Sequence, residues 1–578
     1  MNADSRVIDL LTRAELNAGV SRPIVQVNAG ELPKLVRGAE HVLVKGESGI
    51  FQRGGQLVRI AQLREKTEFN GIRREAGSTI ILPITKEYLT LTLARMADWV
   101  KFDARSRTMR PIDPPEKIAK SLLAIAGEWR FPVLTGLTSA PTLRADGSLL
   151  DAPGYDPVSG LYAAFEPGEF PSINPSPTQN DARDALAVLD DLFSECAFAE
   201  WEPEKHDSAE IAAKKSAHAA VAIAATITAV VRHALPTAPA FGISAHKQGS
   251  GKTTAARAIA HVCTGREPPV LALSDDEAEL RKCLLGILIA GDACVLIDNV
   301  AKPVDSAALC AMLTNATYSD RVLGVNQKVT VPTSSTWLLT GNHLEFVGDL
   351  TSRVLLSVLD PEVEHPESRP FERDLSAYVA EHRGRLLAAA LTVSLAYLAA
   401  GTPPAKAARS RFSEWDRLVR WPLLWLGAAD PLDTQAELRA ADPVRESLVA
   451  VLHAWSQRFG EQATTVATAI EAATGAGISE NPLLLEALRA VAGDRNGDIN
   501  ARRLGRYLAR NLRRIEDGKR LEGAGQDAMT SRRAFRVSLV SRVSANPTRE
   551  NVSSSSKSGS NADNADNAVS ALAESCVY

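Results

Sequence analysis

The sequence predicts an α/β fold: a parallel sheet flanked by helices in the middle of the chain, with an α+β region before it and a smaller winged-helix-like module after it. Such a sheet is indicated because short apolar runs alternate with helical stretches, as is typical of parallel strands joined by helices. A long Ala-rich helical stretch, Ser208–His233, precedes the first run. The runs are Phe241–Ala245, Val270–Leu273, Cys294–Ile297, Thr336–Thr340 and Val354–Leu359.

The N-terminal α+β region is expected over residues 1–200. Ile50–Arg53 and Gln56–Ile60 are typical of two short strands, and the Gly54–Gly55 pair between them suits a tight turn because glycine adopts positive φ at little cost. Four prolines within residues 166–179 mark the end of this region.

Composition sets the remaining boundaries. The sheet-forming part is expected over residues 201–400, a Trp-rich helical region over 401–463 and a compact basic module over 464–543. Residues 544–578 include the run SSSSKSGSNADNADN, which is polar and of low complexity, so we expect a disordered tail.

Charge and cysteine usage limit the class of protein. The chain has 578 residues and a net charge of −4, so only local basic patches, not the whole chain, can attract nucleic acid. Six scattered cysteines without a C-x-x-C pair indicate reduced thiols. The N-terminus lacks the pattern of a signal peptide, and the apolar stretch Ala219–Val231 is shorter than the roughly 20 residues that span a membrane. We therefore expect a cytoplasmic protein without a membrane partner.

A glycine-rich loop lies between the first predicted strand and a helix, in FGISAHKQGSGKTTAARAIA. Phosphate groups are bound by backbone N–H groups at a helix N-terminus, and glycine lets the backbone approach them closely. In such a loop the lysine reaches the β- and γ-phosphates, and the following hydroxyl holds Mg²⁺. The stretch therefore predicts an ATP and Mg²⁺ site formed by Gly249, Ser250, Gly251, Lys252, Thr253 and Thr254.

One position departs from the pattern G-x-x-x-x-G-K-[ST]. His246 stands where the first glycine is expected, which leaves the shape of the first turn of the loop open. The metal shell can be completed by Asp298, which ends the buried run CVLID, because a carboxylate at the tip of a neighbouring strand is a ligand that Mg²⁺ prefers.

The general base is unassigned by the sequence. Asn299 follows Asp298, and an amide can orient a water molecule but cannot accept its proton. Glu277 and Glu279, which lie between the two motifs, are the alternatives, and each fits a solvated helix face equally well.

Two later residues complete the predicted site. Asn342 ends a strand in TWLLTGN and can contact the γ-phosphate or the attacking water, or it is simply a turn residue. Arg353 is placed to contact the ATP of a neighbouring subunit as an arginine finger, or it forms a surface ion pair.

Together these residues resemble the helicase part of phage and plasmid primase–helicase proteins, a branch of the AAA+ ATPases close to superfamily-3 helicases. The resemblance is carried by HKQGSGKTT, LIDNV, LTNATYSDRVLGVNQKVTVP, TGNHLEFVGDLTSRVLLSVLDPEVEHPESRPF and WDRLVRWPLLWLGAADP, with APTLRADGSLLDAPGYDPVSGLY upstream. It covers roughly residues 20–435.

The resemblance implies a role for each motif. It makes the glycine-rich loop the phosphate site, Asp298 the Mg²⁺ ligand, Asn342 the sensor and Arg353 the finger. It also implies a homo-oligomeric ring, a hexamer, in which the hairpin 321–332 points into the channel, with Arg321 and Lys328 near the DNA backbone. The alternative is a surface hairpin whose cations meet solvent.

The C-terminal module carries a concentrated positive charge. In DINARRLGRYLARNLRRIEDGKRL the apolar residues Leu504, Leu508, Leu512 and Ile515 recur at helical spacing, and SRRAFRVSLV follows as a strand. A basic helix followed by a β-ribbon is the order of a winged helix–turn–helix, whose basic helix enters the major groove, although arginine-rich helices are often only solvated surfaces. The predicted DNA-binding residues are Arg502, Arg503, Arg506, Arg510 and Arg513.

The leading functional prediction is an ATP-dependent DNA helicase or translocase that acts on single-stranded or forked DNA in the replication of a phage, plasmid or integrated element. The alternative is a DNA-binding initiator or helicase loader that uses ATP as an assembly switch. A small-molecule kinase fits less well, because it needs no basic helical module. The sequence shows no zinc finger and no acidic cluster of a primase, since Asp190–Asp191 lacks an accompanying histidine, so a primase would be a separate partner chain.

Overall fold

The protein is described by a computed structural model. It covers residues 7–9, 22–69, 71–199, 217–321, 328–369, 371–404, 407, 409–475, 481–494, 496–527 and 532–540. The chain divides into two compact units, Met1–Leu448 and Val449–Tyr578, and each is considered by itself.

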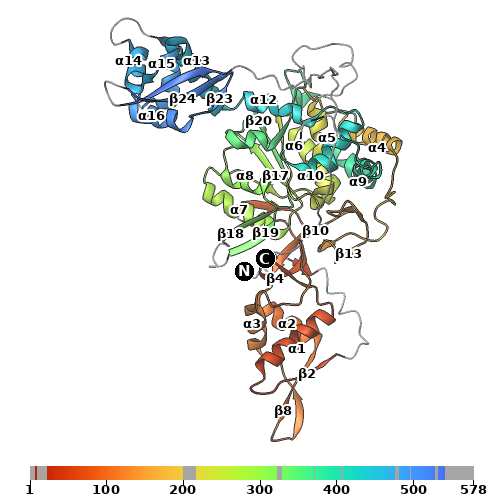
Figure 1. Cartoon of the computed structure of the whole chain (residues 1–578). Coiled ribbons are helices and arrows are strands. Elements are labelled where there is room, and N and C mark those ends of the chain that lie inside the picture. Colours follow the sequence, from red (N-terminus) through yellow and green to blue (C-terminus); the bar gives the residue numbers. More distant parts are fainter. Residues whose placement is uncertain are drawn as a thin grey trace, which may run out of the picture. The chain divides into compact units, whose positions relative to one another are not determined.

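Five parallel strands form the centre of the first unit, and the mixed α/β fold expected from the sequence is confirmed (Figure 1). The strand β15, which precedes the glycine-rich loop, lies between two strands that come much later in the chain. Their order across the sheet is β21-β15-β20-β17-β16. The strands are β15 (Ala240–Ala245), β16 (Val270–Leu271), β17 (Cys294–Val300), β20 (Thr336–Asn342) and β21 (Val354–Leu359).

Helices cover both faces of this sheet because its buried strands alternate side chains between two cores. In β20, Leu338 belongs to the core under α5, α6 and α9, whereas Leu339 belongs to the core under α7 and α8. Within Ala217–Ala234, which is long and apolar enough to span a membrane, 89% of the residues are buried inside the fold. The helices are α5 (Ala217–Val231), α6 (Lys252–Thr264), α7 (Glu277–Ala290), α8 (Ala307–Thr314) and α9 (Leu375–Ala399).

The N-terminal region adds two strands to the same sheet. β6 (Ile72–Arg74) pairs antiparallel with β16, and β5 (Thr67–Phe69) pairs with β6. The guanidinium Nε of Arg74 donates to the Asp292 carboxylate at 3.1 Å, and both side chains are buried. Strand pairing and the buried ion pair thus join the N-terminal region to the sheet across the boundary expected near residue 200.

The rest of the N-terminal region forms a second sheet and a helical layer. The expected hairpin is confirmed: β3 (Ile50–Arg53) and β4 (Gln56–Leu63) pair in register, and Gly54 and Gly55 both have positive φ, 57° and 80°. The strands β1 (Val7–Asp9) and β7 (Thr79–Pro83) flank β4. The helices are α1 (Leu32–Lys45), α2 (Lys86–Met96), α3 (Glu116–Ala124) and α4 (Gln179–Leu192).

Short strands and helices connect these layers. Between α3 and α4 lie β10 (Gly136–Thr138), β11 (Thr142–Leu143), β12 (Leu149–Leu150), β13 (Gly154–Tyr155) and β14 (Leu161–Ala163). The hairpin β18 (Thr317–Arg321) and β19 (Lys328–Pro332) lies between α8 and β20. The Trp-rich segment forms α10 (Ser413–Trp415), a π-helical turn (Asp416–Arg420), α11 (Trp421–Trp425) and α12 (Thr434–Ala440).

The second unit contains helices packed on a small antiparallel sheet of order β22-β25-β24-β23. α13 (Pro443–Phe459) leads into it. The unit consists of β22 (Thr464–Thr465), α14 (Val466–Thr474), α15 (Pro482–Ala492), α16 (Ala501–Arg510), β23 (Ile515–Glu516), β24 (Lys519–Gln526) and β25 (Arg533–Leu539). The predicted tail, residues 544–578, lies outside the described residues.

Candidate nucleotide-binding site and nucleic-acid surfaces

The glycine-rich loop connects the end of β15 to the first residue of α6. Gly251 caps the helix with φ 86°, and Gly249 has φ 76°. A Cβ on Gly249 would lie 3.0 Å from the backbone nitrogen of Glu367, so both conformation and space require glycine there. The loop therefore presents a helix N-terminus whose first N–H groups have no partner within the helix, which is the arrangement that binds phosphate.

His246 does not prevent this geometry. Its side chain is exposed, and its ring centroid lies 5.1 Å from that of His343, which follows β20. The loop closes on the carbonyl of Lys247, which accepts hydrogen bonds from the Ser250 hydroxyl and from Lys252 Nζ, both at 2.9 Å. Hydrogen bonds from these two side chains therefore hold the first turn of the loop, in which His246 replaces the expected glycine.

The predicted metal ligands meet beside the loop. The Thr253 hydroxyl donates to Asp298 Oδ1 at 3.0 Å, and the Thr340 hydroxyl donates to the same oxygen. A register shift between Ile297 and Val300, with φ 57° at Asn299, turns the end of β17 at this point. Mg²⁺ bound to a nucleotide needs only one or two protein oxygen ligands, so Thr253 and Asp298 fit it. No cluster of three His, Cys, Asp or Glu ligands occurs among the described residues.

Lys252 lies within the electrostatic reach of Asp298. Burial lowers the pKa of the Lys252 ammonium from its ordinary value, and the Asp298 carboxylate opposes this shift. A partly desolvated ammonium next to the loop interacts more strongly with phosphate than a fully hydrated one, because the local dielectric is lower.

Asn342 ends β20 directly beside β15, where it pairs with Ala245. Its Oδ1 atom is buried and has no hydrogen-bond partner among the described residues. An unsatisfied buried acceptor costs about 1–3 kcal/mol, so a donor such as a bound water would be favourable there. This observation favours a ligand contact over a simple turn residue.

Arg353 lies at the end of the strands opposite to the glycine-rich loop. It directly precedes β21, whose first residue, Val354, pairs with Ala240 at the start of β15, so about six residues at 3.3 Å each separate it from the loop. Its guanidinium forms an ion pair with Asp349 at 3.1 Å and is largely buried. Arg353 therefore does not contact the phosphate loop of its own chain.

The structure does not bring the two alternative bases to the loop. A Glu277 carboxylate oxygen accepts from the Ala308 N–H at 2.8 Å and from the Ser306 hydroxyl at 3.2 Å, and so caps the start of α8. Glu279 is exposed and pairs with Lys282 at 2.5 Å. Thr340, by contrast, was missed in the sequence, and its signal is a hydroxyl two residues before Asn342 in the strand.

A cavity of about 480 Å³ opens beside the loop. Its far wall comes from Leu192, Glu195 and Cys196 at the end of α4 and from the segment 371–375 at the start of α9. Burial raises the pKa of the Cys196 thiol to about 11, so the thiol is uncharged at neutral pH. Pockets of this size hold small organic ligands. The sequence could not reveal this cavity, because its walls lie far apart along the chain.

The hairpin β18–β19 places Arg321 opposite Lys328. Both side chains are exposed, and neither has an acidic partner among the described residues. Residues 322–327 of the predicted channel hairpin lie outside the described residues. The base of the hairpin, where the Thr333 N–H donates to the Ala316 carbonyl, leads directly into β20.

The basic helix is shorter than the sequence predicted. α16 ends at Arg510, and only Leu504 and Leu508 are buried, whereas Ile515 lies half exposed in a strand. Arg513 consequently lies after the helix, with φ 68°, because the chain turns there toward the sheet.

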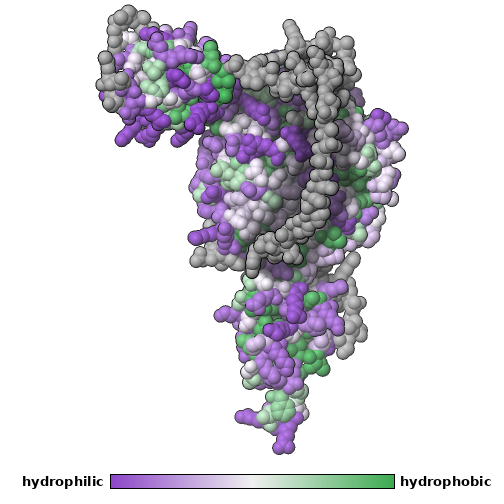
Figure 2. All heavy atoms as spheres, viewed as in Figure 1, coloured by the Kyte–Doolittle hydropathy of each residue, from purple (hydrophilic) through white to green (hydrophobic). Residues whose placement is uncertain are grey.

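Arg503, a predicted DNA-binding residue, has a hydrogen-bond partner within the unit. Its guanidinium donates to the Gly493 carbonyl at 2.5 Å and so closes the end of α15. The other helical arginines are exposed, and Arg502 and Arg506 lie one turn apart. Together with Arg532 and Arg533 they line a groove of about 660 Å³ with Phe535 beside them. Figure 2 shows hydrophilic residues over much of the visible face of this unit. Positive charge thus gathers on one groove, to which Arg510 does not contribute.

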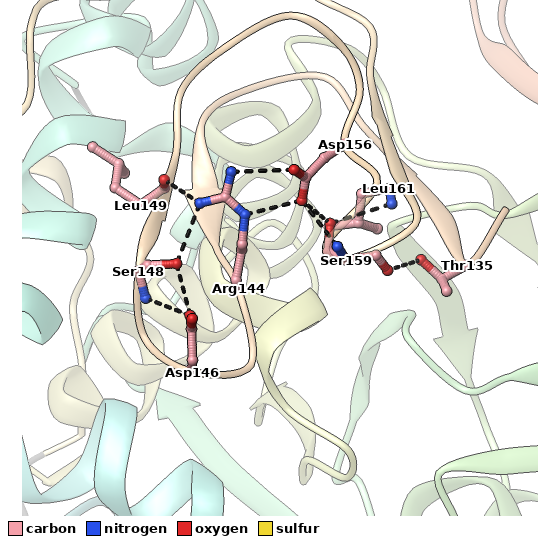
Figure 3. A network of polar contacts seen from close by, with 8 residues as sticks. All are labelled: Thr135, Arg144, Asp146, Ser148, Leu149, Asp156, Ser159 and Leu161. Atoms are coloured by element: carbon pink, nitrogen blue, oxygen red, sulfur yellow. Dashed lines mark hydrogen bonds and ion pairs between the residues drawn. The ribbon is translucent and has the colours of Figure 1, made fainter. Parts of the chain in front are cut away.

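The upstream segment that carried part of the resemblance is built around Arg144 (Figure 3). Its guanidinium donates to Asp156 at 2.9 Å and to the Leu149 carbonyl at 2.7 Å. The guanidinium holds the pKa of Asp156 well below its usual range, and Ser159 hydrogen bonds add to this effect. With its hydrogen bonds directed to neighbouring loops, Arg144 stabilises the connection between β11 and β14.

No protein-family model matches the chain, and no curated protein matches it. Among solved structures, the chain is similar to the apo C-terminal region of NrS-1, residues 305–718, with 11% identity over 87% of this chain and 99% of that chain and a TM-score of 0.36. It is also similar to a structure described as the SCCmec type IV Cch active helicase, with 12% identity over 83% and 91% and a TM-score of 0.32. The JCV helicase has 15% identity over 46% and 73%, with a TM-score of 0.20. Similarities this distant assign no function.

Proposed function

We propose that the chain is an ATP-dependent DNA helicase or translocase of the AAA+ type, related to the helicase part of primase–helicase proteins. The observation that carries this proposal is the contact between Thr253 and Asp298 at the mouth of the glycine-rich loop. It joins a phosphate-binding helix N-terminus to a strand-end carboxylate at the point where the strand order switches, which is where open α/β sheets bind nucleotides.

Each residue at the loop has a distinct task. Backbone N–H groups at Gly249–Thr254 and the Lys252 ammonium bind the phosphates, while Thr253 and Asp298 hold the metal. Bound Mg²⁺ would neutralise charge on the phosphate oxygens. Asn342 offers its free buried carbonyl oxygen, and Asn299, the exposed neighbour of Asp298, can orient a water molecule.

The chain connectivity supports coupling to DNA. The hairpin β18–β19 lies between the strand that carries Asp298 and the strand that carries Asn342. A shift of either strand on nucleotide binding therefore reaches the base of the hairpin through covalent connections. In a homo-hexameric ring the exposed Arg321 and Lys328 would contact the phosphate backbone of single-stranded or forked DNA, and Arg353 would serve the ATP of the next subunit after release from Asp349.

The second unit supports DNA binding of another kind. A helix that presents Arg502 and Arg506 beside a two-stranded ribbon has the order of a winged helix, and we assign the arginine groove to the DNA backbone. We further propose a cytoplasmic role in the replication of a phage, plasmid or integrated element, with any primase supplied by another chain.

A second candidate function is that of an ATP-switched DNA-binding initiator or helicase loader. It is favoured by Asn299 after the metal-binding aspartate and by the engagement of the Glu277 and Glu279 carboxylates with other partners, because hydrolysis without a carboxylate base is slow.

The test measures ATP turnover with and without single-stranded DNA, followed by unwinding of a forked duplex. Thr253→Ala removes the hydroxyl, and Thr253→Ser is the matched control that keeps it. We expect DNA-stimulated turnover and unwinding in the wild type and the serine variant, and loss of both in the alanine variant. Nucleotide-dependent assembly without strand separation would establish the loader, and equal turnover of all three proteins would refute the nucleotide site.

The groove has its own test. Arg502→Ala/Arg506→Ala should weaken duplex binding and flatten its salt dependence, because each lost phosphate contact reduces the slope by about one counterion. Arg489→Ala removes an exposed arginine of α15 outside the groove and is the control.

A further inference from the structure

A three-stranded sheet in the N-terminal region presents an apolar face to solvent. Its strands are β2 (Ile24–Gln26), β8 (Asp98–Asp103) and β9 (Thr108–Pro111), in the order β2-β8-β9. One face covers the core of this region, where Trp99 is buried and its indole N–H donates to the Leu93 carbonyl at 2.9 Å. Because successive residues of a strand point to opposite faces, the neighbours of Trp99 in β8 belong to the outer face.

The outer face collects apolar side chains in register. Phe102 pairs directly opposite Met109, and Val100 pairs opposite Pro111. Phe102 is 52% exposed, Met109 is 45% exposed, and Ile24, on the same face of β2, is 72% exposed. Isolated exposed apolar residues are ordinary, but an exposed aromatic ring paired across the strands with a methionine at the end of a hairpin is an apolar surface on which another planar group can stack.

The turn at the end of this face carries positive charge, whereas Asp98, beside Ile24, is an exposed acid at the other end of the face. Between Asp98 and Pro111 the sequence has four cations and two acids. Asp103 is already neutralised, because it forms an ion pair with Arg110 at 2.8 Å and accepts from the Ser106 hydroxyl at 3.0 Å. Arg105 and Arg107, in the turn between β8 and β9, are exposed and have no acidic partner among the described residues, whereas Lys101 lies on the same face of β8 as Trp99. In Figure 2 the end of the region that carries β8 lies at the bottom of the view. Its tip is hydrophilic, and more apolar residues lie above the tip.

We propose that the outer face of β2-β8-β9 is a binding site for single-stranded nucleic acid. An unpaired base stacks on Phe102 beside Met109, and the phosphates next to that base contact Arg105 and Arg107 in the turn of the hairpin. Aromatic residues that bind bases together with cations that follow the backbone are the arrangement by which single strands are bound without sequence preference. A duplex does not fit, because its bases are stacked within the helix.

The charge distribution argues against a second copy of this chain as the occupant. Two such faces packed turn to turn would place the unpaired Arg105 and Arg107 of both copies close to one another, and like charges disfavour that contact. A strand of phosphates instead neutralises them. The site is separate from the hairpin β18–β19 and from the arginine groove, so it does not depend on the proposed motor activity.

The experiment measures binding of a fluorescent oligothymidylate to the full chain without nucleotide. All proteins carry Arg502→Ala/Arg506→Ala, so that the groove of the second unit contributes less. Phe102→Ala should weaken binding about 5- to 100-fold, the range for loss of one stacked base. Leu91→Ala is the matched control, because Leu91 is 57% exposed on α2 of the same region.

Charge removal gives a second arm. Arg105→Ala/Arg107→Ala should reduce the salt dependence of binding by about two counterions, whereas Lys117→Ala/Lys120→Ala, on the exposed side of α3, should leave it unchanged. Hydrogen exchange at residues 98–112 should slow when the oligonucleotide is added.

Equal affinities of the Phe102→Ala and Leu91→Ala proteins, with unchanged exchange at residues 98–112, would overturn the proposal. A change in oligomeric mass of Phe102→Ala without a change in DNA affinity would also overturn it, and would assign the face to contacts between copies. Neither result bears on ATP turnover, so failure here is distinguishable from failure of the proposed motor function.

Discussion

The turn between β3 and β4 contacts the hairpin β18–β19 closely enough that one methyl group should disturb both. A Cβ added to Gly54 would lie 2.7 Å from the Thr330 carbonyl oxygen and 2.8 Å from a Val329 methyl group, and Val329 is buried. A Cβ added to Gly55 would meet nothing within 4 Å. Both glycines have positive φ, so Gly54→Ala and Gly55→Ala share the same kind of backbone strain and differ in the collision.

The expected magnitude follows from these two terms. An alanine at positive φ costs about 1–2 kcal/mol, partly offset by the lower conformational entropy of the unfolded chain. Overpacking against buried atoms adds about 1–3 kcal/mol. Gly54→Ala should therefore destabilise the contact between the turn and the hairpin by about 1–3 kcal/mol more than Gly55→Ala does.

Local hydrogen exchange is the suitable assay, because a unit of this size does not unfold in two states. Amides of β18 and β19 should exchange about 5- to 100-fold faster in Gly54→Ala than in Gly55→Ala, with unchanged exchange in the second unit. If the hairpin contacts DNA as proposed, DNA-stimulated turnover should fall in Gly54→Ala while basal turnover stays the same. Indistinguishable exchange in the two variants would refute the close contact.

Three further predictions concern single residues. Asp298→Asn should keep the hydrogen bonds from its neighbouring hydroxyls but lose at least about 100-fold in Mg²⁺-dependent ATP turnover, and turnover within about tenfold of wild type would exclude the metal role. Arg353→Ala should abolish turnover of the assembled protein while nucleotide binding persists, whereas a purely structural ion pair with Asp349 would show only a lower melting temperature. Arg144→Ala should cost about 2–4 kcal/mol, because it leaves the nearly buried Asp156 without its partner. Since Arg144 lowers the pKa of Asp156, its contribution is complete above the usual carboxylate range and is lost as the pH falls through and below that range, so the difference in melting temperature between wild type and variant should shrink on acidification.

The sequence predicted the parts of the fold that depend on local patterns. Apolar runs located the five parallel strands, and a glycine-rich turn before Lys252 located the start of α6, because both are properties of a few neighbouring residues. The contact between Thr253 and Asp298 could be anticipated, since parallel strands bring their carboxyl ends to one edge of the sheet.

Features that depend on contacts between distant segments could not be read from the sequence. The pairing of β6 with β16 joins segments separated by well over a hundred residues, and the cavity wall at the end of α4 lies more than fifty residues before the loop that it faces. The guanidinium of Arg503 points to the Gly493 carbonyl, and this contact depends on where α15 ends in space. The helical spacing of apolar residues continues to Ile515, although the helix ends at Arg510 and Ile515 lies in a strand. Periodicity does not distinguish a long helix from a helix followed by a strand whose residue happens to match the spacing.

The antiparallel addition of β5 and β6 has one more consequence. A parallel sheet that ended at β16 would leave a row of unpaired amide and carbonyl groups open to another chain, which is the usual start of aggregation. The N-terminal strands occupy that position, and the buried pair of Arg74 and Asp292 secures them there. Removing the residues before β15 to isolate the nucleotide-binding part would therefore expose the unpaired edge of β16. A truncated protein should precipitate at concentrations at which the intact chain stays in solution.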